Sequence, residues 1–231
     1  MSSIYLIPAV IAEGATETIP LYILEALKNC KVIFAENERT TRRFLKTLDK
    51  DFKIDDYEWF TIHNAEDEQI KEFDLKVKEK KNIAIISEAG CPGIADPGQK
   101  LINHAQKLNC NIKPLVGPSS ILLSIMASGL NGQHFEFLGY LPIDTFEREK
   151  KIKELESASA KDNCTKICIE TPYRNNQLFE SFIKVCNPQT QLCIALEVTG
   201  KNEFIKTKTI KEWKNHKPEL HKKTVVFLLL A

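Results

Sequence analysis

Net charge, long apolar runs and common nucleotide-binding and metal-binding patterns are all scarce in this sequence. Its 231 residues carry 32 lysines and arginines against 31 aspartates and glutamates, a net charge of +1. So little excess charge excludes a strong overall attraction to nucleic acid or to acidic membranes, although it leaves room for a local basic patch. The longest apolar stretch, VVFLLLA at 225–231, is too short to span a bilayer, and the N-terminus MSSIYLIPAV does not resemble a signal peptide. We therefore expect a cytoplasmic protein without a membrane segment.

Patterns for metals and nucleotides are missing as well. The seven cysteines form no C-x-x-C and the five histidines form no H-x-x-x-H. This usage is typical of free, buried thiols in a reducing compartment, and we expect no metal site. Neither G-x-G-x-x-G nor G-x-x-x-x-G-K-[ST] occurs. Nicotinamide dinucleotides and nucleoside triphosphates are therefore disfavoured as ligands.

What the sequence does contain is a regular alternation of apolar β-type runs with amphipathic helical patterns. The first half contains five strand-like runs, at 4–9, 31–36, 57–63, 82–87 and 111–116, and a helical pattern follows each of the first four. This alternation predicts a doubly wound parallel sheet. The second half contains strand-like runs at 134–142, 165–170, 190–199, 203–210 and 223–231. Little helical pattern separates the last three of them, which predicts a mixed sheet. The predicted fold is α/β with two α/β domains, 1–117 and 118–231, and a ligand cleft between them.

Three of the nine glycines lie in one segment, SEAGCPGIADPGQKL (87–101), directly after the most apolar strand of the first half. Ligands of open α/β sheets bind beyond the carboxyl ends of the strands, and glycine allows a backbone to approach a ligand closely. Gly90 and Gly93 have no evident structural requirement, so we interpret this segment as a ligand-binding surface. Asp96 followed by Pro97 is also a good helix start, and we expect Asp96 to be an N-cap rather than a catalyst.

A second stiff turn occurs in VGPSSILL, where Gly117 and Pro118 precede a helical pattern. Ser119 or Ser120 is placed to cap that helix. On its own, this segment fits a hinge between domains as well as part of a site. Two stiff loops at the ends of neighbouring strands together indicate a cleft.

Polar side chains follow other strands of the first half at the same edge. Glu36 comes directly after the second strand, and Arg39 on the helix at 38–48 is suited to hold a phosphate. We interpret Arg42 and Arg43 as solvated surface charge. His63 follows the third strand, although a lone histidine is more often a structural residue than a base.

The order and form of these segments resemble a known family. SEAGCPGIADPGQKLI is similar to the S-D-A-G-x-P-x-I-S-D-P-G signature of the tetrapyrrole methylase superfamily. Further segments resemble, in the expected order, those of its bacterial branch that methylates a ribose 2′-hydroxyl in small-subunit ribosomal RNA: AENERTTRRFL, IHNAEDEQ, VGPSSILLSIMASGL, FEFLGYLP and IETPYRNNQLFESF. The resemblance covers nearly the whole chain.

The resemblance implies an S-adenosylmethionine-dependent methyltransferase of the tetrapyrrole methylase fold, with RNA as acceptor and a homodimeric assembly. The domain at 1–117 would face the substrate and the domain at 118–231 the cofactor. A hydroxyl acceptor gains from a nearby base, and we assign that role to Glu36, with His63 second and Arg39 as the phosphate contact. The residues expected to border the donor are Ser87, Glu88, Ala89, Gly90, Gly93, Ile94, Ala95, Asp96, Ser119, Ser120, Ile169, Glu170, Ala195 and Leu196.

Differences from that branch keep two other functions open. AVIAEGA stands where the branch has G-N-L, and Glu88 stands where it has the aspartate of S-D-A-G. One alternative is a methyltransferase for a tetrapyrrole or another small metabolite, which the near-neutral charge favours. The other is a module that binds the donor without catalysis.

Overall fold

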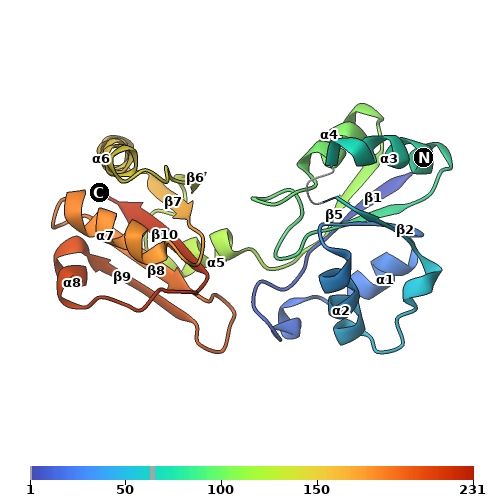
Figure 1. Cartoon of the computed structure of the whole chain (residues 1–231), viewed down its shortest axis with the longest axis horizontal. Coiled ribbons are helices and arrows are strands. Elements are labelled where there is room, and N and C mark those ends of the chain that lie inside the picture. Colours follow the sequence, from blue (N-terminus) through green and yellow to red (C-terminus); the bar gives the residue numbers. More distant parts are fainter. Residues whose placement is uncertain (1, 63–65) are drawn as a thin grey trace. The chain divides into compact units, whose positions relative to one another are not determined.

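The computed structural model describes residues 2–62 and 66–231, and the chain forms two compact units, Met1–Ser119 (unit 1) and Ser120–Ala231 (unit 2) (Figure 1). The second candidate base, His63, lies outside the described residues. The predicted division of labour, with the substrate on 1–117 and the cofactor on 118–231, stays a prediction.

Unit 1 is built on a parallel sheet, as the alternation of strands and helices predicts. Its strand order is β3-β2-β4-β1-β5, and each described pairing is parallel. The central strands β2 and β4 are buried along their whole length, which explains why VIFA and IAII are apolar at every position. The strands are β1 (Ser3–Ile7), β2 (Val32–Ala35), β3 (Glu58–Thr61), β4 (Ile83–Ile86) and β5 (Asn111–Pro114).

Helices cover both faces of this sheet (Figure 1). One face packs against α1 (Tyr22–Lys28) and α2 (Glu38–Leu48), and the other against α3 (Glu66–Lys78) and α4 (Gln99–Lys107). Two short 3-10 helices, η1 (Thr16–Thr18) and η2 (Ile54–Asp56), lie in the connections. Because helices return the chain between parallel strands, all five strands end at the same edge of the sheet.

Unit 2 has the predicted mixed sheet, in the order β6-β7-β10-β8-β9. β6 pairs parallel with β7, whereas the pairings that involve β10 and β9 are antiparallel. One face carries a core that includes Phe182 and Trp213 from the covering helices, and α5 contacts the other face. The elements are α5 (Ser120–Ser128), β6 (Phe135–Tyr140), α6 (Thr145–Asp162), β7 (Thr165–Ile169), α7 (Asn175–Val185), β8 (Gln191–Leu196), β9 (Phe204–Thr209), α8 (Ile210–Asn215) and β10 (Val225–Leu230).

The end of β9 departs from the prediction. The strand expected over 203–210 ends at Thr209, and Ile210 begins the short helix α8, which the sequence analysis missed. The N–H of Glu212 donates to Thr209 Oγ1 (3.2 Å), and the N–H of Thr209 donates to Glu212 Oε2 (2.8 Å). This reciprocal capping box satisfies the first backbone donors of the helix. The T-x-x-E pattern in the sequence is the signal that predicts such a helix start.

Within residues 2–62 and 66–231, no helix combines the length and the apolar character that a membrane span requires.

Candidate functional site

The loops that follow four neighbouring strands of unit 1 are tied together at the carboxyl edge of the sheet. The strand order places β2, β4, β1 and β5 side by side, so loops that are far apart in the sequence meet there. The loop after β4, called the glycine loop below and comprising residues 87–98, contacts each of the other three. This is the edge at which open parallel sheets bind ligands.

The glycine loop pairs with the segment that follows β1. The N–H of Ala9 donates to the carbonyl oxygen of Gly90 (2.9 Å), and the N–H of Gly90 donates to the carbonyl oxygen of Ala9 (3.1 Å). Gly90 has a φ angle of +68°, and a Cβ atom there would lie 3.3 Å from Ile11 Cγ2. Both the backbone angle and the tight packing therefore require glycine at this position.

The segment that follows β5 joins the same assembly. Cys91 Sγ donates to the carbonyl oxygen of Pro118 (3.5 Å). A Cβ atom at Gly117 would overlap the Cβ and Cγ atoms of Pro8 in the segment after β1. The sequence analysis missed these contacts of Pro8 and Cys91, because a pattern along the chain does not reveal which distant loops meet. The Gly117-Pro118 pair, which marks a tight turn, is the local signal that pointed to this segment.

Glu36 connects the end of β2 to the glycine loop. Its N–H donates to the carbonyl oxygen of Ile86 (3.0 Å), and its Oε2 accepts the N–H of Glu88 (2.7 Å). The side chain is half-buried. The carboxylate therefore holds the first residues of the glycine loop in place and brings a negative charge to the edge of the sheet.

The glycine loop turns sharply through residues with positive φ angles, including Gly93 (+77°), Ala95 (+61°) and Gly98 (+111°). At Ala95 this conformation stores strain of about 1–3 kcal/mol. The prediction that Asp96 caps the next helix is wrong, because α4 begins at Gln99 and its N-cap is Gly98. The left-handed turn at Gly98 carries the chain into the helix, which begins three residues after Asp96.

Asp96 lies half-buried in the loop instead, near the carboxylates of Glu36 and Glu88, and these three residues form the acidic trio. Burial, and then the negative charges of Glu36 and Glu88, raise the pKa of Asp96 from 3.8 to about 7. Asp96 is therefore partly protonated at neutral pH. Across residues 2–62 and 66–231, no group of three or more histidines, cysteines and carboxylates is arranged to hold a metal ion.

The raised pKa of Asp96 predicts a specific pH dependence of stability. Between about pH 4 and pH 7 the folded state binds a proton at Asp96 that the unfolded state has released, so this contribution to stability is lost as the pH rises toward 7. Asp96→Asn removes the titration. We expect the melting temperature of the variant, relative to that of the wild type, to increase from pH 4 to pH 8. Thermal melts at both pH values check this, with the exposed Asp51→Asn as control, and parallel curves for Asp96→Asn and wild type would contradict the assignment.

The glycine loop presents a surface suited to the expected sulfonium donor. Ser87 is buried and its Oγ donates to the carbonyl oxygen of Gly90 (3.1 Å), so it shapes the loop from within. The sulfonium and ammonium groups of such a donor are attracted by the acidic trio, and its aromatic base can pack on an exposed apolar side chain, so contact of the donor with this loop stays a prediction. The exposed residues of the loop that offer this surface are Glu88, Ala89, Ile94 and Ala95.

Arg39 follows β2, and the two serines lie at the boundary between the units. Arg39 is exposed in the first turn of α2, and its N–H donates to Oδ1 of the N-cap residue Asn37 (3.1 Å). Ser119 is the last residue of unit 1, and Ser120 begins both unit 2 and α5. Contact between these serines and the donor stays a prediction.

In unit 2, predicted donor contacts lie where β7 and β8 end. Ile169 and Ala195 are both in register with Val226 of β10, so they stand at one level of the sheet on either side of it. This alignment is consistent with a common role, which stays a prediction.

Two other predicted donor contacts of unit 2 have structural partners of their own. The side chain of Leu196 packs in the hydrophobic core. The buried carboxylate of Glu170 accepts hydrogen bonds from Arg174 Nη2 (2.7 Å) and Nε (3.1 Å). Contact of these two residues with a ligand stays a prediction.

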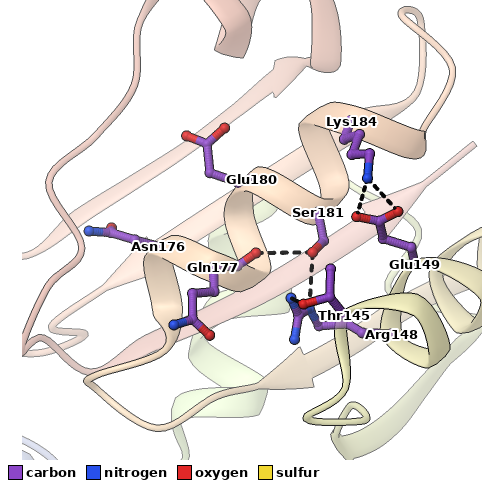
Figure 2. Close-up of a pocket in the computed structure, with 8 residues that line it drawn as sticks. All are labelled: Thr145, Arg148, Glu149, Asn176, Gln177, Glu180, Ser181 and Lys184. Atoms are coloured by element: carbon purple, nitrogen blue, oxygen red, sulfur yellow. Dashed lines mark hydrogen bonds and ion pairs between the residues drawn. The ribbon is translucent and has the colours of Figure 1, made fainter.

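A polar hollow in unit 2 lies between α6 and α7 and is organised by Arg148 (Figure 2). The guanidinium is buried and donates through Nε to Ser181 Oγ (2.9 Å), through Nη1 to the carbonyl oxygen of Ile143 (2.7 Å) and through Nη2 to Thr145 Oγ1 (3.2 Å). None of the predicted site residues lines this hollow. Arg148 therefore fastens the start of α6 to α7.

Removal of this guanidinium is expected to destabilise unit 2. Arg148→Met loses hydrogen bonds from a buried charged group, which are worth about 1–3 kcal/mol. The matched Lys184→Met removes an exposed ion pair with Glu149 and should cost less than about 1 kcal/mol. Urea unfolding in a Trp59→Phe background, where Trp213 reports on unit 2, measures both. Equal losses for the two variants would contradict the structural role of Arg148.

Comparisons with known proteins agree on one family. The family model described as "Tetrapyrrole (Corrin/Porphyrin) Methylases" matches residues 8–214. The chain is 29% identical over 218 residues to "Ribosomal RNA small subunit methyltransferase I" of Bacillus subtilis (strain 168), which covers 93% of this chain and 71% of that protein. It is 31% identical over 201 residues to the protein of the same name from Hydrogenobaculum sp. (strain Y04AAS1), with 87% and 82% covered.

Solved structures with the same fold include two methyltransferases. The methyltransferase CobJ matches with a TM-score of 0.63 at 16% identity, over 98% of this chain and 92% of that chain. Uroporphyrin-III-C-methyltransferase from Thermus thermophilus matches with a TM-score of 0.56 at 15% identity, over 100% and 94%. At these identities the likeness establishes the fold.

Proposed function

Because this chain belongs to the tetrapyrrole (corrin/porphyrin) methylase family and is an S-adenosylmethionine-dependent methyltransferase, we propose that it methylates the 2′-hydroxyl of a ribose in small-subunit ribosomal RNA. The observation that carries the choice of RNA is the 29–31% identity, along most of the chain, to proteins named for that substrate. Sequence identity to an enzyme named for porphyrins is about half of that, at 15%, and this likeness establishes the fold alone.

The protein itself forms no covalent bond in this reaction. S-adenosylmethionine supplies a methyl group that is already activated on a sulfonium sulfur. The tasks left to the chain are to align the acceptor oxygen with that methyl group, to exclude water and to take up the hydroxyl proton. A rigid backbone surface such as the glycine loop suits the first two tasks.

We assign the proton to Glu36 and the acceptor phosphate to Arg39. Glu36 has one oxygen fixed by the N–H of Glu88, so the orientation of its carboxylate is set before an acceptor arrives. Arg39, three residues later, is exposed at the start of α2 and has a planar guanidinium suited to a phosphate. Charge separates the two ligands. The acidic trio attracts the cationic donor and repels the RNA backbone, whose phosphate is assigned to Arg39.

The test is direct transfer of a labelled methyl group. Purified protein is incubated with labelled S-adenosylmethionine and either unmodified small-subunit ribosomal RNA, intact small subunits or a reduced porphyrinogen extract. We expect label in RNA, recovered after nuclease digestion as a 2′-O-methylated nucleoside. Label in the porphyrinogen fraction alone would transfer the assignment to a small metabolite. Donor binding by calorimetry without transfer to any fraction would instead identify a binding module.

A homodimer and a cytoplasmic location complete the proposal. The resemblance to the family supports both, and light scattering coupled to size exclusion measures the first. A mass near twice 26.3 kDa is expected, and a monomer that transfers methyl groups at full rate would contradict it.

A further inference from the structure

Helix α2 carries a concentration of positive charge although the chain as a whole is nearly neutral. Its sequence, ERTTRRFLKTL, contains four basic residues and one acidic residue. Thr41 and Leu45 face the core and are buried, whereas Arg39, Arg43 and Lys46 are exposed. These three are spaced by four and three positions, which places them on one outer face of the helix.

The charges on this face are not neutralised within the protein. Arg42 forms an ion pair with Glu38 and lies over the ring of Trp59, at 5.1 Å from its centroid, so it belongs to the structure of unit 1. Across residues 2–62 and 66–231, no carboxylate pairs with Arg39, Arg43 or Lys46, and Lys46 Nζ donates to the carbonyl oxygen of Lys50 (2.9 Å). In contrast, Lys76 and Lys81 near α3 both pair with Glu58.

The stripe starts at the candidate site and leads away from it. Asn37 caps α2 directly after Glu36, so the first turn with Arg39 lies at the carboxyl edge of the sheet. With a rise of 1.5 Å per residue, Arg43 follows about 6 Å and Lys46 about 10 Å further along the axis. A hollow near the end of α2 is lined by the acidic Asp55 and Asp56 and by the basic residues Arg42, Lys46 and Lys53.

We propose that Arg39, Arg43 and Lys46 form a phosphate track along α2 that holds the RNA strand flanking the methylated ribose. This inference rests on the proposed function, which makes RNA the acceptor. A row of unpaired cations beside a reactive edge attracts a polyanion, and release of its counterions supplies the affinity. The track orients the strand while the base and ribose face the edge, which explains how a protein of net charge +1 engages RNA.

The experiment compares two double variants with the same change of charge. Arg43→Gln with Lys46→Gln removes two cations from the track, and glutamine keeps the helix propensity. Lys150→Gln with Lys153→Gln removes two exposed cations at the same spacing from α6 in unit 2. Binding of unmodified small-subunit ribosomal RNA is measured between about 0.05 and 0.3 M salt, and donor binding is measured by calorimetry in parallel. Melting temperatures confirm that each variant is folded.

We expect the track variant to lower the slope of log K against log salt by about 1.4 and to weaken RNA binding about tenfold near 0.15 M salt, since each single-strand phosphate contact contributes about 0.7 to the slope. The α6 variant should behave as the wild type, and donor affinity should be unchanged in both. Equal RNA binding and methylation by the track variant and the α6 variant would overturn the track while leaving the proposed function intact. A wild-type protein that neither binds nor methylates RNA would overturn both.

Discussion

Glu36→Gln is expected to slow methyl transfer by about 10²–10⁴-fold, the usual contribution of a general base, while changing donor affinity by less than about fivefold. The amide oxygen of glutamine still accepts the N–H of Glu88, so the glycine loop keeps its anchor. What the variant loses is the negative charge that takes up the acceptor proton. Single-turnover rates with labelled donor, together with calorimetric donor binding, measure the two effects separately.

Glu36→Ala provides the matched comparison, because it removes both the charge and the anchor. Donor binding should then weaken along with the rate, since Glu88 N–H loses its partner at the start of the glycine loop. Loss of the Glu36 charge also removes one cause of the raised pKa of Asp96, so the pH dependence that Asp96 produces should move to lower pH in both variants. A Glu36→Gln variant with the wild-type rate would exclude Glu36 from the reaction.

Gly117→Ala is expected to weaken donor binding at least tenfold and to lower the free energy of unfolding by about 1–3 kcal/mol, the usual cost of overpacking. The added Cβ atom would overlap the ring of Pro8, so the segments after β1 and β5 cannot both keep their positions. Ala9, the next residue after Pro8, exchanges two backbone hydrogen bonds with Gly90 of the glycine loop. A displacement of Pro8 therefore reaches the candidate donor surface. Calorimetric titration with S-adenosylmethionine and thermal melts check both expectations.

Gly132→Ala is the control for that substitution. Gly132 lies in unit 2, outside the candidate site, and a Cβ atom there would meet Ile125 Cγ1 at 3.9 Å, an ordinary contact. Donor affinity and stability should both stay close to the wild-type values. If Gly117→Ala behaved like Gly132→Ala, the tight contact between the two segments would have no part in donor binding.

The fold was predictable because its signals are local and repeated. The fully apolar runs VIFA and IAII correspond to strands buried on both faces, and the helical patterns between them correspond to the connections that a parallel sheet needs. α8 was missed because an alternating strand pattern ran directly into it, so the short T-x-x-E capping signal at Thr209 was overlooked.

The assignment of the site residues stays a prediction, and the sequence pointed to the loop geometry only where one residue type carries the information. Gly90 and Gly93 stood out because three glycines fall in one short segment. The expectation that they have no structural requirement is wrong, because both have positive φ angles and little room for a Cβ atom. Asp96 was assigned to a helix cap because Asp-Pro is a good helix start, whereas the left-handed Gly98 moved the start of the helix past it. The raised pKa of Asp96 comes first from burial and then from Glu36, sixty positions earlier in the chain, and no local pattern reports either.

The central claim is that the glycine loop, fixed by the segments after β1, β2 and β5, is the seat of the methyl donor. The structure of the protein crystallised with S-adenosylhomocysteine tests it most directly. We expect the sulfur and the adjoining chain of the ligand in van der Waals contact with residues between Gly90 and Asp96. Ligand bound away from the carboxyl edge of the parallel sheet, with the glycine loop in contact with protein alone, would contradict the account.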